Sequence, residues 1–252
     1  MLKMCRAVWL SIAYYLSWVW FGLGGLKLNL ACIPLLVLPH RERHGPRARA
    51  ATRWMFNFWL RWMDFSGVIR VTWIGFDRPL PTGVIYVANH PGIMDAPFLL
   101  ARLPDTVCIF KPALLRNPFI APTALACGYV SAGENGIDFI RNAVDRVNAG
   151  QSILIFPEGT RTVVNTSLNP LKPGFALIAR RANCPVQLIR VRTSRNLGSK
   201  SLPWWRTPPL PGWVEITLDD CIPADEIDTP IAFANRITAH FLANLQPVSD
   251  FT

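Results

Sequence analysis

The sequence predicts an α/β fold in which helices flank a mainly parallel central sheet. Short apolar runs alternate with helical patterns between residues 67 and 245, as they do in proteins built from βαβ units. A chain of 252 residues is long enough to bury a substantial core, and its 51% hydrophobic and 17% charged residues exclude a disordered protein. An apolar and basic segment comes first, so we expect a membrane-associated helical segment at residues 1–65 and a globular domain at residues 66–252.

The N-terminal segment contains two uncharged, mostly apolar runs, residues 7–26 and residues 28–39, which are separated by Lys27. The first run alone is long enough to span a bilayer. Basic residues lie before the first run and after the second, which favours a cytoplasmic position for both ends and therefore a hairpin that enters one leaflet. Four residues are expected to supply its bend: Gly22, Gly24, Gly25 and Pro34. A single span and a cleaved signal peptide are the alternatives.

The charge distribution points to a membrane surface. The formal net charge is +10, and residues 1–66 hold nine Lys and Arg residues against two acidic residues. Positive charge beside an apolar, Trp-rich run favours an anionic membrane as the partner and argues against nucleic acid. The six cysteines form no Cys-x-x-Cys pair and no zinc-finger spacing, so we expect no bound metal, no disulfide framework and a reducing compartment.

Residues 50–65 have a helical pattern that is apolar nearly all round, which suits either the protein core or the membrane interface. Strands are then predicted at residues 67–75, 84–88, 107–110, 128–131, 152–156, 186–192 and 213–218. Helices are predicted at residues 92–103, 113–127, 136–149, 174–182 and 229–245. Residues 202–212 are rich in proline and predict a loop that exposes the aromatic pair Trp204 and Trp205.

A first group of chemically active residues follows the predicted strand at residues 84–88. Asn89 and His90 stand at the carboxyl end of this strand, where open α/β sheets bind their ligands. Asp95, five residues after His90, can accept a hydrogen bond from one ring nitrogen and so leave the other nitrogen as a general base. A His that only caps the start of a helix would show the same pattern.

A second group is Phe-Pro-Glu-Gly-Thr-Arg at residues 156–161, directly after a predicted buried strand. The Pro-x-Gly turn presents Glu158 and Arg161 at the same sheet edge as His90. Arg161 beside exposed backbone N–H groups suits a phosphate or carboxylate, and Glu158 is expected to orient Arg161 or to bind a substrate hydroxyl. A surface salt bridge is the alternative for this hexapeptide taken alone.

Together the two groups resemble the glycerolipid acyltransferase family, which includes the bacterial 1-acyl-sn-glycerol-3-phosphate acyltransferases. The family's Asn-His-x-x-x-x-Asp block is matched by Asn89, His90 and Asp95, and its Phe-Pro-Glu-Gly-Thr-Arg block is matched in full. The resemblance implies an O-acyltransferase that moves a fatty acyl chain from acyl-CoA or acyl carrier protein to the free hydroxyl of a lysophospholipid such as 1-acyl-glycerol-3-phosphate. It makes His90 and Asp95 catalytic, with no cofactor beyond the acyl donor. The substrate-binding residues that it implies are Asn89, Lys111, Glu158, Gly159, Thr160, Arg161 and Lys172.

The family's second block, Gly-x-x-Phe-Ile-x-Arg, is not matched. Gly128 begins it, but Ser131 and Ala132 replace the Phe-Ile pair, and Glu134 stands in place of the Arg that the family assigns to the acceptor phosphate. Loss of a charge-assisted partner weakens binding by about 1.5–3 kcal/mol, and a like charge weakens it further. The alternative is therefore an acceptor without the phosphatidate head group, as in specialised-lipid or aryl-polyene biosynthesis.

Two other classes of function compete with a transferase. A thioesterase or other hydrolase with a serine nucleophile would need Gly-x-Ser-x-Gly, which the sequence does not contain. An inactive membrane scaffold would have no need of the His90–Asp95 pair. We therefore expect a transferase at the cytoplasmic face of the inner membrane, with membrane phospholipid or lysolipid and an acyl donor as its partners; the sequence does not indicate an oligomeric state.

Overall fold

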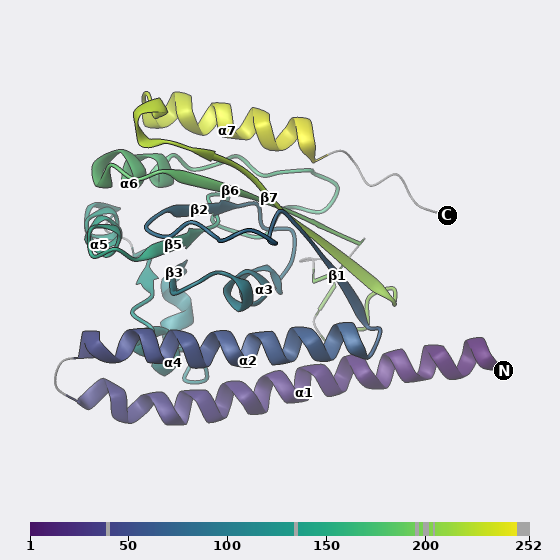
Figure 1. Cartoon of the computed structure of the whole chain (residues 1–252). Helices are drawn as coiled ribbons and strands as arrows, with labels where there is room; N and C mark the ends of the chain where they lie inside the picture. Colours follow the sequence, from purple (N-terminus) through teal and green to yellow (C-terminus); the bar gives the residue numbers. More distant parts are fainter. Residues whose placement is uncertain (39–40, 134–135, 195–196, 199–201, 204, 246–252) are drawn as a thin grey trace.

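The computed structural model describes the chain except for residues 39–40, 134–135, 195–196, 199–201, 204 and 246–252. The described residues form a seven-stranded sheet with helices on both of its faces (Figure 1). The strands are β1 (Ile69–Ile74), β2 (Ile85–Ala88), β3 (Thr106–Phe110), β4 (Val130–Ser131), β5 (Ser152–Ile155), β6 (Val186–Thr193) and β7 (Gly212–Ile222). Their order across the sheet is β1-β7-β6-β2-β5-β3-β4.

The sheet is mainly parallel, as predicted. Each pair of neighbouring strands is parallel except β6 and β7, which pair in antiparallel fashion. The central strands β2 and β5 lie side by side, and each of their residues is buried. Parallel strands buried on both faces need a helical layer on each side. Since β2 and β5 run in the same direction, the residues that follow them meet at one edge of the sheet.

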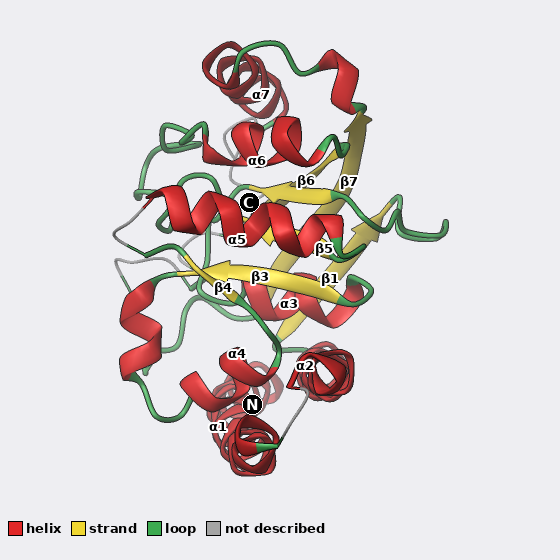
Figure 2. Ribbon diagram, turned by 90° about the vertical axis from the view of Figure 1, so that its left-hand side faces the viewer, coloured by secondary structure: helices red, strands yellow, loops and turns green. Residues whose placement is uncertain are grey.

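One face of the sheet is covered by α5 (Gly136–Asn148), α6 (Gly174–Ala182) and α7 (Pro230–Asn244) (Figure 2). In α5 the apolar residues Ile140, Ala143 and Val147 recur at helical spacing and are buried against the sheet. The last helix, α7, is capped by Thr229, whose hydroxyl accepts a hydrogen bond from the N–H of Ala232. These three helices enclose one half of the core.

The other face is covered first by α3 (Asp95–Arg102) and then by the long antiparallel pair α1 (Leu2–Val37) and α2 (Gly45–Phe65), with α4 (Ala121–Ala126) beside them (Figure 1). Trp59 of α2 is 1% exposed and joins these layers. Its indole N–H donates to the backbone oxygen of Ser17 in α1 at 2.9 Å, and its ring lies 5.8 Å from that of Phe98 in α3. The helical pair therefore shares its core with the α/β unit.

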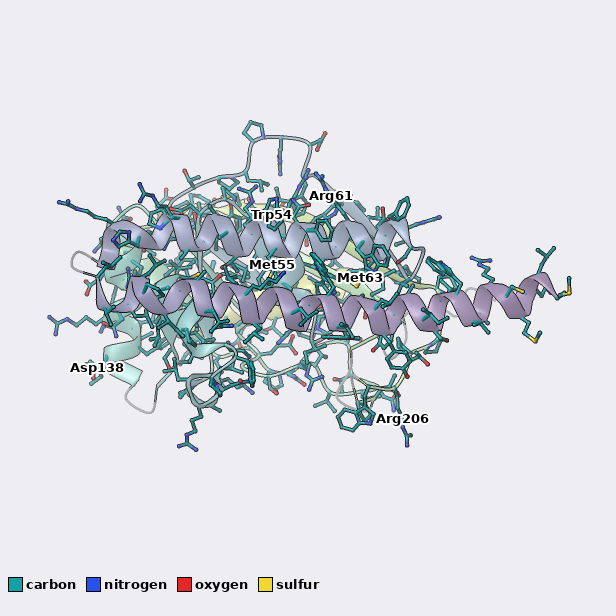
Figure 3. All side chains as sticks on the ribbon, turned by 90° about the horizontal axis from the view of Figure 1, so that it is seen from below. Trp54, Met55, Arg61, Met63, Asp138 and Arg206 are labelled. Atoms are coloured by element: carbon teal, nitrogen blue, oxygen red, sulfur yellow. The ribbon has the colours of Figure 1, made fainter. Side chains whose placement is uncertain are left out.

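A helical hairpin is present at the N-terminus, but it is formed by α1 and α2. The predicted turn between the apolar runs 7–26 and 28–39 is wrong. Gly22, Gly24, Gly25 and Pro34 all lie inside α1, which is one continuous helix of 36 residues. The chain turns back only after α1, through the short 3₁₀ helix at Arg41–His44. A Cβ on Gly24 would lie 3.2 Å from the sulfur of Met55, and Met55 lies between the two helices (Figure 3). This glycine therefore allows a close approach between helices, and packing outweighs its low helix propensity.

The predicted helix at residues 113–127 is divided in two in the structure. A 3₁₀ helix covers Pro112–Arg116, and α4 begins at Ala121. Between them Asn117 is extended, with φ −91° and ψ 109°, because Pro118 follows it and disfavours a helical conformation there. The remaining predicted helices and strands all occur, with ends shifted by a few residues.

Within the described residues, α1 is the single helix that is long and apolar enough to cross a membrane. The mean hydropathy of its most apolar window is 1.5, and 11% of that window is buried in the protein. One face of α1 packs on the protein through six buried residues: Leu10, Ala13, Tyr14, Ser17, Asn29 and Cys32. The helix is therefore attached to the α/β unit along most of its length.

Candidate active site

His90 and Asp95 form a hydrogen-bonded pair at the carboxyl end of β2. The Nδ1 atom of His90 lies 2.8 Å from Oδ2 of Asp95, the first residue of α3. The His90 side chain is 19% exposed and the Asp95 side chain 2% exposed. Because the carboxylate occupies Nδ1, a neutral His90 ring carries its proton there and its lone pair on Nε2. The geometry thus provides a base with a defined tautomer.

The local structure holds the Asp95 carboxylate in place. The N–H of Gly92 donates to Asp95 Oδ2 at 2.7 Å, so the turn between β2 and α3 closes over the carboxylate. Burial raises the pKa of Asp95, and the hydrogen bonds from His90 and Gly92 and the charge of Arg161 oppose that rise. Asp95 can therefore stabilise the imidazolium form of His90 from a site that water does not reach.

The imidazole ring of His90 is also held from the side. Phe156 follows β5, and its ring stacks on that of His90 with a centroid separation of 4.3 Å and an interplanar angle of 27°. With Asp95 on one ring nitrogen and Phe156 on one face, the ring has little freedom to rotate. The second motif therefore contributes a positioning residue to the first.

Glu158 ties the two motifs together through the backbone. Its Oε1 accepts a hydrogen bond from the N–H of His90 at 2.7 Å, and its Oε2 accepts one from the N–H of Asn169 at 2.9 Å. The hydroxyl of Thr162 also donates to this carboxylate, and the N–H of Thr162 donates to the backbone oxygen of His90. Glu158 is only 4% exposed, and burial raises its pKa against the effect of these donors.

These contacts differ from the role expected of Glu158. The sequence suggested an interaction with Arg161 or with a substrate hydroxyl, whereas both carboxylate oxygens accept hydrogen bonds from the protein itself. A buried carboxylate requires such donors. Asn89 is similar: it is 2% exposed, and its side-chain amide exchanges two hydrogen bonds with the backbone of Val191 in β6, at 2.8 and 2.7 Å. Both residues position the loop that carries His90.

Two cationic residues, Arg161 of the second motif and Lys172 beside it, lie nearer to the surface of the site. The guanidinium of Arg161 donates to the backbone oxygen of Gly198 at 2.9 Å and acts electrostatically on Asp95. Gly159 has φ +66°, and a Cβ there would lie 3.1 Å from the Nζ atom of Lys172. The left-handed turn therefore brings the Lys172 amine against the motif. Thr160 is half-buried in the same turn.

Two other residues of the predicted site stand apart. Lys111 is exposed directly after β3, which is parallel to β5, so it lies at the same edge of the sheet. No hydrogen bond or ion pair joins it to the other described site residues. Glu134, which replaces the expected Arg, lies outside the described residues. Among the residues that the structure does describe, no group of three or more His, Cys, Asp or Glu side chains is placed to hold a metal ion.

A cavity of about 300 Å³ lies beside Arg161, and its walls were not predicted from the sequence. Tyr14 and Trp18 of α1 form one wall, and the loop that carries Trp205 and Arg206 forms another. The Tyr14 hydroxyl donates to the backbone oxygen of Arg206 at 3.4 Å. Only the tertiary fold brings these segments together, since almost two hundred residues separate them. Met94 and Arg161 also line the cavity, so it adjoins the His90–Asp95 pair.

Comparison with known proteins agrees with this site. The family model "Acyltransferase" matches residues 74–192, a range that contains both motifs. A 1-acyl-sn-glycerol-3-phosphate acyltransferase of Helicobacter pylori is 24% identical over 184 residues, which cover 70% of this chain and 74% of that protein. The chloroplastic 1-acyl-sn-glycerol-3-phosphate acyltransferase BAT2 of Brassica napus is 29% identical over 109 residues, which cover 42% of this chain and 31% of that protein.

The fold has a counterpart among solved structures. The crystal structure of the 1-acyl-sn-glycerophosphate (LPA) acyltransferase PlsC from Thermotoga maritima superimposes with a TM-score of 0.71 at 19% identity, over 97% of this chain and 96% of that one. Motifs, site geometry and family model together define the protein as an acyltransferase. Residues 74–192 match the Acyltransferase family, and the chain is similar over most of its length to a 1-acyl-sn-glycerol-3-phosphate acyltransferase.

Proposed function

We propose that this acyltransferase moves a fatty acyl chain from a thioester, acyl-CoA or acyl carrier protein, to the free hydroxyl of a lysophospholipid such as 1-acyl-glycerol-3-phosphate. The observation that carries the proposal is the 2.8 Å contact between His90 Nδ1 and Asp95 Oδ2 beside a cavity lined by both Arg161 and apolar residues of α1. Such a site has a base for a hydroxyl, a cation for a head group and an apolar wall for a chain.

In the proposed reaction His90 acts as the general base. Its Nε2 takes the proton of the acceptor hydroxyl as the oxygen attacks the thioester carbonyl, and Asp95 stabilises the resulting imidazolium. The new carbon–oxygen bond forms, the carbon–sulfur bond breaks, and the departing thiolate receives the proton from His90. No acyl-enzyme is formed, because the nucleophile belongs to the substrate.

The acceptor proposal rests on charge. Arg161 belongs to the motif that contacts the His90 backbone, and the amine of Lys172 packs against Gly159 of that motif, so an anionic head group beside the base would meet two cations. The curated relatives from Helicobacter pylori and Brassica napus carry names that specify 1-acyl-sn-glycerol-3-phosphate as acceptor. The substitution of Glu134 for the family's Arg favours the second candidate, an acceptor with a less charged head.

The membrane proposal rests on the exposed face of α1. A stripe of apolar residues with spacings of three or four runs along the whole helix and is exposed at Val8, Ile12, Leu16, Val19, Leu23, Leu26, Leu30, Ile33 and Val37. The opposite face packs on the protein from Leu10 to Cys32. A helix attached in this way lies along the membrane surface and places its stripe in one leaflet. We propose the cytoplasmic face of the inner membrane, from the basic flanks of the apolar segment.

The function is tested by release of free thiol from an acyl thioester, measured with the full-length protein in detergent. Transfer requires that thiol appear only when lysophosphatidate or another lysolipid is present, and that the acylated lipid appear in equal amount. Thiol release at the same rate without any acceptor would show a hydrolase and contradict the proposal.

A further inference from the structure

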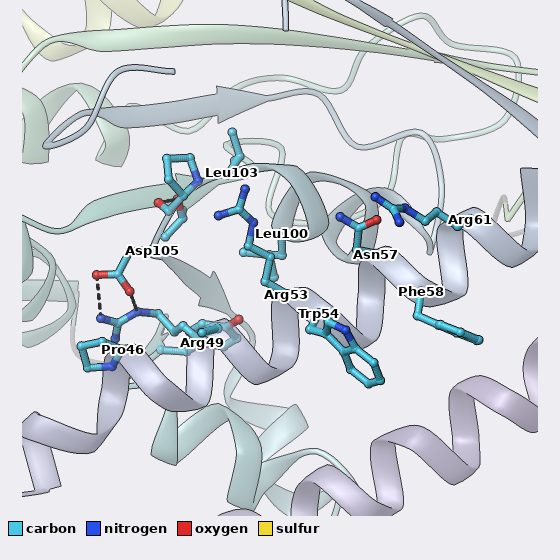
Figure 4. Close-up of a pocket in the computed structure, with 14 residues that line it drawn as sticks. Pro46, Arg49, Arg53, Trp54, Asn57, Phe58, Arg61, Leu100, Leu103 and Asp105 are labelled. Atoms are coloured by element: carbon cyan, nitrogen blue, oxygen red, sulfur yellow. Dashed lines mark hydrogen bonds and ion pairs between the residues drawn. The ribbon is translucent and has the colours of Figure 1, made fainter. Parts of the chain in front are cut away.

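A second cavity lies on the outer flank of α2, at the other edge of the sheet from the His90–Asp95 pair (Figure 4). Its volume is about 660 Å³. One wall is a stripe of α2 that includes Arg53, Asn57 and Arg61, and the other is the end of α3 and the start of β3, from Leu100 to Thr106. The catalytic Asp95 begins α3 and the cavity meets its last turn, so this helix separates the two sites.

The cavity carries positive charge that no carboxylate of the described residues neutralises. At its inner end Arg49 is 4% exposed and forms a two-pronged ion pair with Asp105, at 2.7 and 3.1 Å. Among the described residues, Arg53 donates to the backbone oxygens of Ala101 and Arg102, at 3.3 and 3.0 Å, and pairs with no carboxylate. Arg61 is exposed, and no described acidic side chain pairs with it. Two guanidinium charges therefore face the opening, and an Arg fork matches the geometry of a phosphate.

The aromatic residues of the same stretch, Trp54 and Phe58, line the side of the cavity that is nearer to α1. Asn57 and Arg61 lie next to each other at the cavity, whereas Trp54 and Phe58 point toward α1 (Figure 4). Trp54 is 68% exposed and Phe58 42% exposed, and the Phe58 ring lies 4.7 Å from that of Trp20 in α1. The outer flank of α2 is thus apolar on the side of the exposed α1 stripe and cationic on the side of the α/β unit. A phospholipid standing upright in a leaflet has the same order of groups.

We propose that this cavity binds the phosphate of an intact anionic phospholipid, whose chains lie in the leaflet beside Trp54 and Phe58. The lipid would be neither acceptor nor product at the catalytic site. It would hold α2 at head-group depth and fix the orientation of the protein on the membrane. The inference rests on the membrane attachment that is part of the proposed function.

The test measures how strongly the full-length protein partitions onto phosphatidylcholine vesicles with and without phosphatidylglycerol. We expect wild-type protein to prefer the vesicles that contain phosphatidylglycerol. Each basic residue at an anionic surface strengthens binding roughly fivefold, so the double variant Arg53→Gln, Arg61→Gln should lose about 25-fold of that preference and keep its binding to phosphatidylcholine. Arg61→Gln alone should lose roughly fivefold of the preference for phosphatidylglycerol, and a substitution at this exposed position leaves the fold intact.

The matched control, Arg141→Gln with Arg181→Gln, removes two exposed charges from the helices on the far side of the sheet and should change the preference by less than about twofold.

Equal phosphatidylglycerol preference in wild type and in both cavity variants would overturn the proposal. A thermal unfolding assay with inorganic phosphate gives a second such outcome. If phosphate stabilised wild type but not Arg61→Gln, and the vesicle preference were unchanged, the cavity would be a site for free phosphate and the proposal would be overturned. Acyl transfer to detergent-solubilised lysolipid is measured in parallel. If transfer were absent in wild type while the vesicle results held, the proposed function would fail and the lipid site would stand.

Discussion

The carboxylate of Glu158 accepts a hydrogen bond of 2.7 Å from the backbone N–H of His90 across 68 residues of sequence. This bond joins the loop after β2 to the loop after β5, the two neighbouring central strands. The motif that contains Glu158 therefore holds in place the backbone of His90, the proposed general base. Both carboxylate oxygens of Glu158 accept hydrogen bonds from the protein itself, so we propose that Glu158 acts as a positioning residue.

Replacement of Glu158 by Gln should lower both kcat and stability. The amide can accept only through its oxygen, so one of the donors from His90, Thr162 or Asn169 loses its partner. A buried donor left without a partner costs about 1–3 kcal/mol of unfolding free energy. We expect kcat to fall at least tenfold with little change in KM for the acceptor. Glu215→Gln is the matched control, since Glu215 is 30% exposed and pairs with Arg192 at the surface. A raised KM with unchanged kcat and stability would instead assign Glu158 to substrate binding.

The difference in unfolding free energy between wild type and Glu158→Gln should depend on pH with a definite sign. Burial raises the pKa of Glu158 above its ordinary value of 4.5, so the folded state holds this proton more tightly than the unfolded state does. The stability that the wild-type carboxyl contributes is then fully present below 4.5 and is lost as the pH rises through the folded pKa. The unfolding free energy of wild type minus that of Glu158→Gln should decrease as the pH is raised from about 4.5 to about 7. An increase over that range, in chemical unfolding experiments, would show that the donors outweigh burial.

Restoration of the missing charge should alter the choice of acceptor. Glu134→Arg recreates the cation that the family assigns to the acceptor phosphate and removes a repulsive charge. We expect kcat/KM for lysophosphatidate to rise about tenfold or more relative to kcat/KM for a neutral-headed lysolipid. Glu226→Arg makes the same change in net charge at a position in the 3₁₀ helix at Ala224–Glu226, before α7, and serves as control. An equal effect on both substrates would show that residue 134 does not discriminate between acceptor head groups.

Charge on the exposed stripe of α1 should release the protein from membranes. Val19 and Leu23 are 56% and 53% exposed on that stripe, so Asp at both positions disturbs no core contact. Loss of two buried apolar side chains from the leaflet should lower partition onto vesicles by about 100-fold or more. Activity on detergent-solubilised substrate should remain. Ile231→Asp with Leu242→Asp, on exposed positions of α7, should leave partition unchanged; release by this control pair alone would place the membrane face elsewhere.

The contact between His90 and Asp95 could be predicted from the sequence because its determinants are local. His90 follows an apolar strand and Asp95 is within one helical turn of it, so their contact needs only a strand, a turn and the start of a helix. The carboxyl-edge position of residues 156–161 follows equally from the alternation of strands and helices.

Other features depend on partners that are distant in sequence. Gly24 was predicted to form a bend, because the sequence does not reveal that Met55, in the other helix of the hairpin, packs closely against it. The contribution of Tyr14 to the cavity beside Arg161 arises from the packing of α1 beside the loop that carries Arg206. Two of the donors to Glu158 are the backbone N–H groups of His90 and Asn169. Every residue type except proline has such a group, so the sequence does not indicate which residues donate. Periodicity and motif spacing contain no information on such contacts.

Single-turnover acyl transfer by His90→Ala tests whether His90 removes the proton from the acceptor hydroxyl. Removal of a general base typically lowers the rate by about 100-fold to 10,000-fold, and we expect a loss in this range with an unchanged fold and vesicle binding. His240→Ala is the matched control, because His240 also lies beside an aspartate, Asp219 at 3.5 Å, but on α7. Transfer by His90→Ala at a rate near that of wild type would contradict the claim.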